Sequence, residues 1–159
     1  MTFTVISTGF ADGGALPDAQ VQAKGNRSPQ LSWSGAPAGT KSFAITCFDP
    51  DAPTGSGFWH WTVANIPVDV TELAEGASSG GLPPGAVEGR TDFGEPGFGG
   101  AAPPPGHGPH RYIFTVFAVD TERLDVTPEN SGAVFGFNLH FHTLATASIT
   151  GVYENRSLG

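Results

Sequence analysis

Residues 42–66 read SFAITCFDPDAPTGSGFWHWTVANI, and this stretch decides the fold class. Its two ends, 42–49 and 58–66, are rich in aromatic and β-branched residues, which favour β-strands. Between them, residues 50–57 contain two prolines and two glycines, which end strands and form turns. The pattern predicts two antiparallel strands joined as a hairpin.

Similar strand patterns occur on both sides of this hairpin. Further strands are expected at 2–7, 111–119 and 147–153. The stretches 25–40 and 76–110 are crowded with turn formers and are expected to be loops.

Helix is scarce in this sequence. Residues 133–146 suggest one helix, and residues 70–75 could form a helical turn or two. Because strands dominate, the sequence predicts one mainly β domain over residues 1–159, with antiparallel sheets packed face to face.

The composition narrows the function. Hydrophobic residues make up 38% of the chain and phenylalanine occurs twelve times, so a core can form. The net charge is −8, with seven basic and fifteen acidic residues and no basic cluster. Binding to nucleic acids or to anionic membranes requires clustered Lys and Arg, so neither partner is expected.

The sequence also suggests where the protein works. Cys47 is the single cysteine, so an intrachain disulfide is excluded and an oxidising compartment is not indicated. The N-terminal residues do not resemble a signal peptide, and no apolar run is long enough for a membrane helix. We therefore expect a cytoplasmic protein without an integral membrane segment.

Two carboxylates stand at the end of the first hairpin strand, in Asp49-Pro50-Asp51-Ala52-Pro53. By strand alternation, Asp49 shares a face with Phe43, Ile45 and Cys47 and lies at the rim of the core if that face is buried. The alternative interpretation is a turn in which both carboxylates accept backbone N–H bonds.

The second hairpin strand contains Phe58-Trp59-His60-Trp61. Alternation places His60 on one face with Thr62, Ala64 and Ile66, and both tryptophans on the other. The hairpin can bring His60 and Asp49 to the same end of one sheet, although a lone strand histidine is usually a structural core residue.

The third polar cluster is PPPGHGPHRY, residues 103–112. Here a stiff proline run meets glycines such as Gly108, and exposed glycine N–H groups can hold an anion. Alternation then places His110, Tyr112 and Phe114 on one strand face. An ordinary loop with a structural tyrosine explains the same pattern.

Together these motifs resemble the phosphatidylethanolamine-binding protein family, also called Raf-kinase-inhibitor-like proteins. The segments that carry the resemblance are GNRSPQLSW (25–33), the strand with DPDAP (43–53), WHW (59–61), DFG (92–94), GFGG (97–100), PPPGHGPHRY (103–112) and ASITG (147–151). The resemblance covers about residues 7–153. It implies a large antiparallel sheet packed on a smaller one, with a few short peripheral helices.

The resemblance also implies an anion pocket. Its residues would be Asp49, His60, Pro104, His110 and Tyr112, with Asp51, Pro53 and Gly108 in secondary positions. It further suggests a cis bond between Ala52 and Pro53.

These observations favour a non-enzymatic binding protein for phosphate-type groups. The ligand would come from a phospholipid headgroup, a nucleotide or a phosphorylated partner, and no cofactor is expected. His60, His110, Tyr112 and loop N–H groups would donate to it, and Asp49 would orient one histidine and favour its charged form. Regulation of a kinase or protease and formation of a homodimer stay open.

Two alternatives remain. A hydrolase would use Asp49 and His60 as a base pair, but the sequence contains no evident nucleophile motif. A metal site would draw on the five histidines, of which His140 and His142 diverge if their segment is helical.

Overall fold

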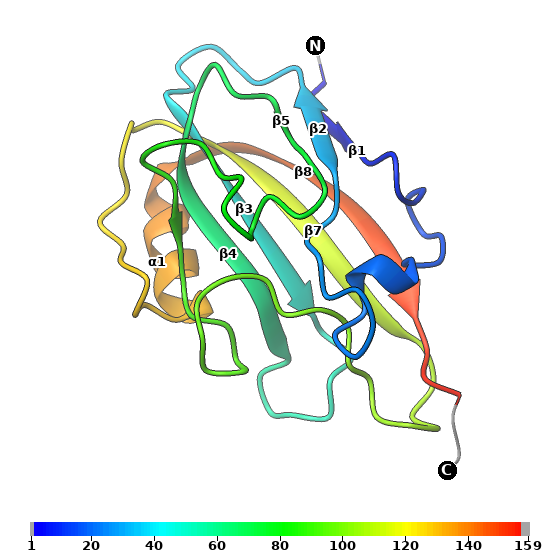
Figure 1. Ribbon diagram of the computed structural model, residues 1–159. Coiled ribbons are helices and arrows are strands. Elements are labelled where there is room, and N and C mark those ends of the chain that lie inside the picture. The colour runs from blue at the N-terminus through cyan, green and yellow to red at the C-terminus, as the bar shows by residue number, and fades with distance from the viewer. Residues whose placement is uncertain (1, 157–159) are drawn as a thin grey trace.

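The computed structural model describes residues 2–156 and is mainly β (Figure 1). Its elements follow one another as β1 (Thr4–Ile6), the 3-10 turn η1 (Asp18–Gln20), β2 (Leu31–Ser34), β3 (Ser42–Asp49), β4 (Phe58–Pro67), β5 (Glu72–Leu73), β6 (Val87–Glu88), β7 (His110–Val119), α1 (Gly132–His142) and β8 (Thr143–Tyr153).

The strands form two antiparallel sheets. Over the described residues, the large sheet has the order β6-β4-β3-β7-β8 and the small sheet has the order β1-β2-β5. Figure 1 shows the small sheet in front of the large one and α1 behind it. The expected architecture of a large sheet packed on a smaller one is confirmed.

Each face of the large sheet packs against a different layer. The inner face, which includes Phe43, Trp61 and Phe114, shares a core with Leu31 and Trp33 of the small sheet. The outer face carries a second core, which consists of Ala44, Ala64, Val119, Leu124, Val126, Phe135 and Leu139. Strand alternation on β3 and β7 thus separates two cores, with α1 covering only the outer one.

Several predicted boundaries were wrong. The helix expected over 133–146 ends at His142, and β8 begins at Thr143 without an intervening loop. The Thr143 hydroxyl donates to Leu139 O, 2.6 Å away, and the strand then pairs with β7 from Val119 onward. The β-branched residues of 143–153 therefore extend the strand backward into the expected helix.

Short strands also occur in three segments that we expected to be loops or helical. Residues 70–75 contain β5, where Glu72 pairs with Ser32, in place of a helical turn. The partner strand β2 lies within 25–40, and β6 lies within 76–110, both of which we expected to be loops. All three strands are too short to show a period in the sequence. Within residues 2–156, no helix is both long and apolar enough to cross a membrane.

Candidate functional site

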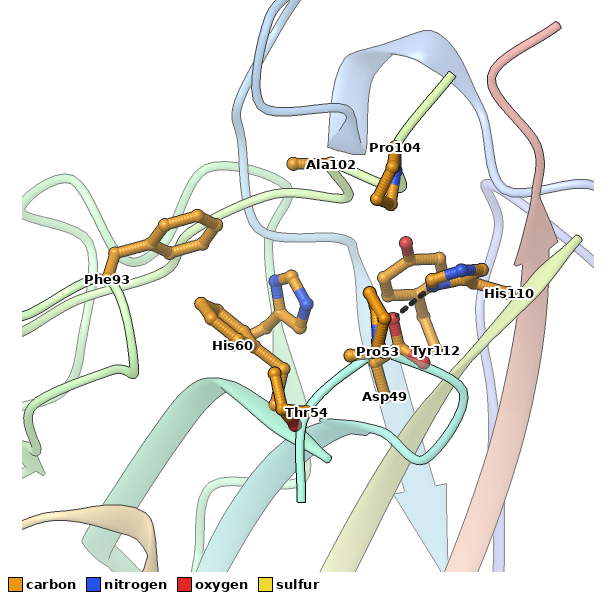
Figure 2. Close-up of a pocket in the computed structure, with 11 residues that line it drawn as sticks. Asp49, Pro53, Thr54, His60, Phe93, Ala102, Pro104, His110 and Tyr112 are labelled. Atoms are coloured by element: carbon orange, nitrogen blue, oxygen red, sulfur yellow. Dashed lines mark hydrogen bonds and ion pairs between the residues drawn. The ribbon is translucent and has the colours of Figure 1, made fainter. Parts of the chain in front are cut away.

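A cavity of about 190 Å³ opens at one end of the large sheet, on its inner face (Figure 2). Its lining residues come from β3, β4, β7 and the loops 50–57 and 92–104, and they are Asp49, Ala52, Pro53, Thr54, Phe58, His60, Phe93, Ala102, Pro104, His110 and Tyr112. The structure therefore brings together the five principal site residues expected from the sequence, and Pro53 with them. The other two secondary residues, Asp51 and Gly108, lie outside the lining.

Asp49 ends β3 and is held by two hydrogen bonds. Its side chain is buried, and Oδ1 accepts from the Asp51 backbone N–H at 2.7 Å. Oδ2 lies 2.7 Å from Nδ1 of His110. Both interpretations of the DPDAP motif thus hold at once, because the carboxylate forms a turn and also lies at the cavity.

The DPDAP turn has a trans backbone. Within the described residues the structure contains no cis peptide bond, so the expected cis bond at Ala52–Pro53 is wrong. The connection 50–57 is long enough to reverse the chain with trans bonds, and the Thr54 N–H donates to Ala52 O at 2.7 Å.

Asp51 connects this turn to β7 by hydrogen bonds that lie outside the cavity. Its carboxylate accepts from the backbone N–H, Nε and Nη2 of Arg111, each at 2.9 Å. The hydrogen bonds from the Arg111 guanidinium lower the pKa of Asp51 to about 2. Asp51 therefore positions the turn rather than the ligand.

His60 reaches the cavity through a β-bulge. Cys47 pairs with Trp61 and Phe48 pairs with Trp59, so His60 is an extra residue opposite β3. A bulge turns the strand locally and re-aims side chains. The expected alternation was therefore wrong, because Trp61 lies in the core between the sheets whereas Trp59 packs against Phe48 with ring centroids 4.5 Å apart.

A second shift lies further along β4. Phe43 pairs with Ile66 and Ile45 pairs with Val63, so the faces change again. Ile66 lies in the inner core and Ala64 in the outer core, although we expected them to share a face.

The environment of His60 favours its neutral form. Nδ1 lies 2.8 Å from the carbonyl oxygen of Gly99, so this nitrogen carries the proton and donates. Burial lowers the pKa of His60 below its ordinary value of 6.5, although the Gly99 carbonyl and the Asp49 charge oppose that effect. At neutral pH, Nε2 is therefore an acceptor, and Figure 2 shows the ring directed into the cavity.

His110 is buried and uses both of its ring nitrogens. Nδ1 contacts Asp49, and Nε2 lies 2.6 Å from Nδ1 of the exposed His107. The loop folds back because Gly108 adopts a φ of +93°, which favours glycine, and because the His107 N–H donates to Pro104 O. The spacing of these histidines alone was weak evidence, yet the structure places them in contact.

Tyr112 places a buried hydroxyl beside the cavity. Within the described residues no neighbour has good hydrogen-bond geometry to this hydroxyl, although the Ala102 backbone N–H and the Asp49 carboxylate are close to it. Burial first, and then the negative charge of Asp49, raise the pKa of Tyr112 well above its usual range, so the phenol keeps its proton. Figure 2 shows the hydroxyl directed towards Pro104 at the edge of the cavity.

Two aromatic walls were not expected from the sequence. Phe58 and Phe93 pack on each other with ring centroids 4.7 Å apart, and both contact the His60 ring, at 4.9 and 5.5 Å. Phe58 pairs with Asp49 across the hairpin, so its place beside the site could have been derived from the expected strand pairing. Phe93 comes from a loop whose path no local pattern indicates.

Gly99 allows the loop that carries Phe93 to pack closely against the strand that carries His60. Its N–H donates to His60 O at 2.9 Å, while its own carbonyl accepts from the His60 ring. A Cβ atom at Gly99 would lie 2.4 Å from the Phe93 ring. Only glycine lets Phe93 lie this close to the backbone that holds His60.

The hydrolase and metal-site alternatives depend on a nucleophile and on clustered metal ligands. The Cys47 thiol is buried, and burial raises its pKa well above the usual range, which makes it a poor nucleophile. Over residues 2–156, no group of three His, Cys, Asp or Glu side chains is arranged to hold a metal ion. His142 lies on α1 and pairs with Asp120 at 2.8 Å.

The chain is similar to a known protein family in sequence and in structure. The family model described as phosphatidylethanolamine-binding protein matches residues 6–154. The UPF0098 protein YbhB of Escherichia coli is 54% identical over 157 residues, which covers 94% of this chain and 99% of that protein.

Two solved structures extend the comparison. E. coli YbcL, described as a new member of the mammalian PEBP family, superposes with a TM-score of 0.95 at 51% identity and covers 98% of this chain and 100% of its own. The PEBP homologue CT736 of Chlamydia trachomatis gives 0.84 at 30% identity, with coverage of 97% and 98%.

Proposed function

Because the chain belongs to the phosphatidylethanolamine-binding protein family, we propose that it is a non-enzymatic binding protein whose inner-face cavity holds a small phosphate-type group. A cavity of about 190 Å³ can enclose a headgroup-sized anion and is too small for a whole lipid or nucleotide. The remainder of such a ligand would lie outside.

The observation that carries this proposal is the unpartnered hydroxyl of Tyr112. A buried polar group without a hydrogen bond costs about 1–3 kcal/mol, and an anionic oxygen placed against this donor removes the cost. The high pKa of Tyr112 keeps that donor present throughout the ordinary pH range.

The state of His60 adds a condition on the ligand. A neutral His60 presents an acceptor, so it pairs with a ligand that carries its own proton, such as a phosphomonoester monoanion. A fully deprotonated anion needs His60 to take up a proton first. Because burial lowers the pKa of His60, affinity for such an anion should rise mainly below pH 6.5. Asp49 still opposes this shift, as we expected of a nearby carboxylate, but burial outweighs it, so the expected rise in the pKa of His60 was wrong.

The phosphate-type group could belong to a phospholipid headgroup, a nucleotide or a phosphorylated protein, since all present the same oxygens. A phosphorylated kinase or protease partner would bind with that group in the cavity. A cytoplasmic location is consistent with a lone buried cysteine, Cys47.

Titration calorimetry with sulfate and with glycerophosphoethanolamine tests the proposal. Tyr112→Phe should weaken sulfate binding by about tenfold, while the free energy of unfolding stays equal or rises because a buried unpaired hydroxyl is gone. Tyr153→Phe, which alters the other tyrosine of the chain, should bind as the wild type does. Equal affinity for Tyr112→Phe and wild type would place the anion elsewhere.

The same titrations distinguish ligand sources and reaction classes. Tighter binding of glycerophosphoethanolamine than of sulfate favours a lipid headgroup, whereas equal affinities favour recognition of the anion alone. Repeating the sulfate titration in buffers of different ionisation enthalpy measures the proton taken up. Release of ethanolamine or glycerol from glycerophosphoethanolamine would contradict a non-enzymatic role.

A further inference from the structure

A second hollow lies next to the cavity. Its volume is about 520 Å³, and Ala102 and Pro104 line both hollows. Figure 2 shows these two residues at the edge of the cavity, with the Tyr112 hydroxyl directed towards Pro104. We call the second hollow the side groove, and its lining comes from the segments 21–24, 101–105 and 153–156.

The sizes of the two hollows fit a single ligand. Small-molecule sites usually occupy about 300–1,000 Å³, so the cavity of about 190 Å³ encloses little more than the phosphate-type group. Together with the 520 Å³ of the side groove, the space is about 700 Å³, which lies within that range. A ligand with its phosphate group in the cavity can therefore place its remaining part past Pro104, in the side groove.

Hydrogen bonds between distant segments hold the walls of the side groove. The Gln22 N–H donates to Ala101 O at 2.9 Å, and the Ala101 N–H donates to Gln20 O at 3.0 Å. On the other side, the Gly106 N–H donates to Asn155 O at 2.9 Å. Because backbone hydrogen bonds join these segments, the side groove is formed before a ligand binds.

Two of the seven basic residues of the chain, Lys24 and Arg156, line the side groove. Lys24 pairs with Asp18 at 3.3 Å and Arg156 with Glu154 at 3.1 Å, and the two cationic side chains are 51% and 85% exposed. Exposed ion pairs contribute little to stability, so both cations can change partner at small cost. The hydrogen bond with Asp18, and then that with Tyr153, raise the pKa of Lys24, which keeps it charged.

The charge balance of the side groove differs from that of the whole chain. Glu154 is the one acidic residue among the described residues that line it, so cations outnumber carboxylates there although the chain has a net charge of −8. The overall field repels an acidic group of a ligand, and the two local cations can offset that repulsion. The acyl chains of a lipid, in contrast, would leave both cations next to an apolar group.

We propose that the side groove is a second subsite of the same binding site, and that Lys24 and Arg156 select phosphate esters that carry a further acidic group. This inference rests on the proposed binding of a phosphate-type group in the cavity. The ligand spans Pro104, with its phosphate beside Tyr112 and its second acidic group, a carboxylate or another phosphate, beside the two cations. An ester whose remaining part is neutral gains nothing from them.

Titration calorimetry at pH 7 with two matched series of ligands tests the proposal. Ethyl, butyl and hexyl phosphate carry one acidic end, whereas ethanediol, butanediol and hexanediol bisphosphate carry two acidic ends at increasing separation. At one length or more, the bisphosphate should bind about five- to tenfold more tightly than the monophosphate of the same length. Two identical ends alone account for a factor of about two.

The double variant Lys24→Gln, Arg156→Gln should reduce this advantage to the statistical factor. The matched control Lys41→Gln, Arg123→Gln makes the same change of net charge at a hollow beside the opposite end of β3, and it should keep the advantage. Both double variants should bind the monophosphates equally well. No advantage in the wild type, or an equal loss in both double variants, would overturn the proposal. A monophosphate affinity that rises with alkyl length would also overturn it, because that result indicates an apolar lipid subsite.

Failure of the proposed function would give a different result. If Tyr112→Phe binds butyl phosphate as tightly as the wild type does, the cavity does not hold the phosphate group and both proposals are refuted. If Tyr112→Phe weakens the binding of butyl phosphate but the bisphosphates have no advantage, the role of the cavity stands and the side groove alone is refuted.

Discussion

Nε2 of His110 lies 2.6 Å from Nδ1 of His107, so a single proton is held between the two imidazole rings. Because Nδ1 of the same ring contacts Asp49 at 2.7 Å, the buried carboxylate is connected to the protein surface through two histidines. The expected role of His110 as a direct donor to the anion therefore requires His107 to move aside.

This arrangement predicts the effect of removing His107. His107→Ala frees Nε2 of His110 without disturbing the pair with Asp49. In the doubly protonated ring, Nε2–H can then donate to sulfate, which should bind about three- to tenfold more tightly, the equivalent of one hydrogen bond of about 0.5–1.5 kcal/mol. Titration calorimetry measures the change, with His140→Ala on the distant α1 as the control. Weaker binding would instead show that His107 contacts the anion itself.

Removing His110 should affect stability as well as binding. His110→Ala leaves the buried Asp49 carboxylate without its 2.7 Å partner, and leaving a buried charge unpaired in this way costs about 3–5 kcal/mol. Urea denaturation measures the loss. Adding Asp49→Asn should recover part of it, because no buried charge then remains unpaired. If the double variant is less stable than His110→Ala alone, the carboxylate is stabilised by other groups.

His60 should make stability depend on pH. Burial lowers its pKa in the folded protein, so as the pH falls below about 6.5 the unfolded chain takes up this proton first. The free energy of unfolding should therefore decrease as the pH falls to the folded pKa, and the loss is complete below that value. His60→Asn keeps a donor near the Gly99 carbonyl but cannot titrate, so its unfolding free energy should fall less over the same range. Parallel curves for both proteins would contradict this assignment.

Asp51 should make the free energy of unfolding depend on pH in the acid range. Its lowered pKa means that its stabilisation is present above about pH 4 and is lost as the pH falls to about 2. Since Asp51 and Arg111 are 28% and 56% exposed, solvent screening limits the contribution, and Asp51→Asn should cost about 1 kcal/mol or less. Chemical denaturation at pH 7 and pH 3 measures it, with Asp18→Asn at the more exposed pair with Lys24 as the control. An equal cost at both pH values would mean that the charge of Asp51 does not matter.

The sequence predicted those parts of the site that follow a regular strand. Asp49 shares a face with Cys47, and Tyr112 with His110, because β3 pairs regularly with β7 as far as Phe48 and Ile113, and β7 pairs regularly with β8 from His110 onward. The prediction for His60 was correct about the cavity but wrong about the strand faces. A bulge depends on how two strands align, and the sequence of β4 alone does not show that alignment.

Other features depend on segments that are distant in the sequence. Phe93 lines the cavity because its loop is fixed by contacts such as Gly100 N–H to Asn26 Oδ1, 2.8 Å. The sequence pattern around Phe93 does not indicate a contact between residues so far apart in the chain. The helix boundary was missed for the opposite reason, since α1 continues into β8 with neither Gly nor Pro between His142 and Thr143.

The order of strands in the large sheet has a consequence for folding kinetics. β3 lies between β4, which follows it directly, and β7, whose Val119 pairs with Ser42. The hairpin of β3 and β4 can close early, whereas the pairing of β3 with β7 must wait for a long loop to close, which is slow. Because the cavity also needs residues of the loops 50–57 and 92–104 in place, it should be completed after both pairings, when the folding barrier is largely crossed. A bound anion would then prolong the lifetime of the native protein by slowing its unfolding, and would leave the refolding rate almost unchanged.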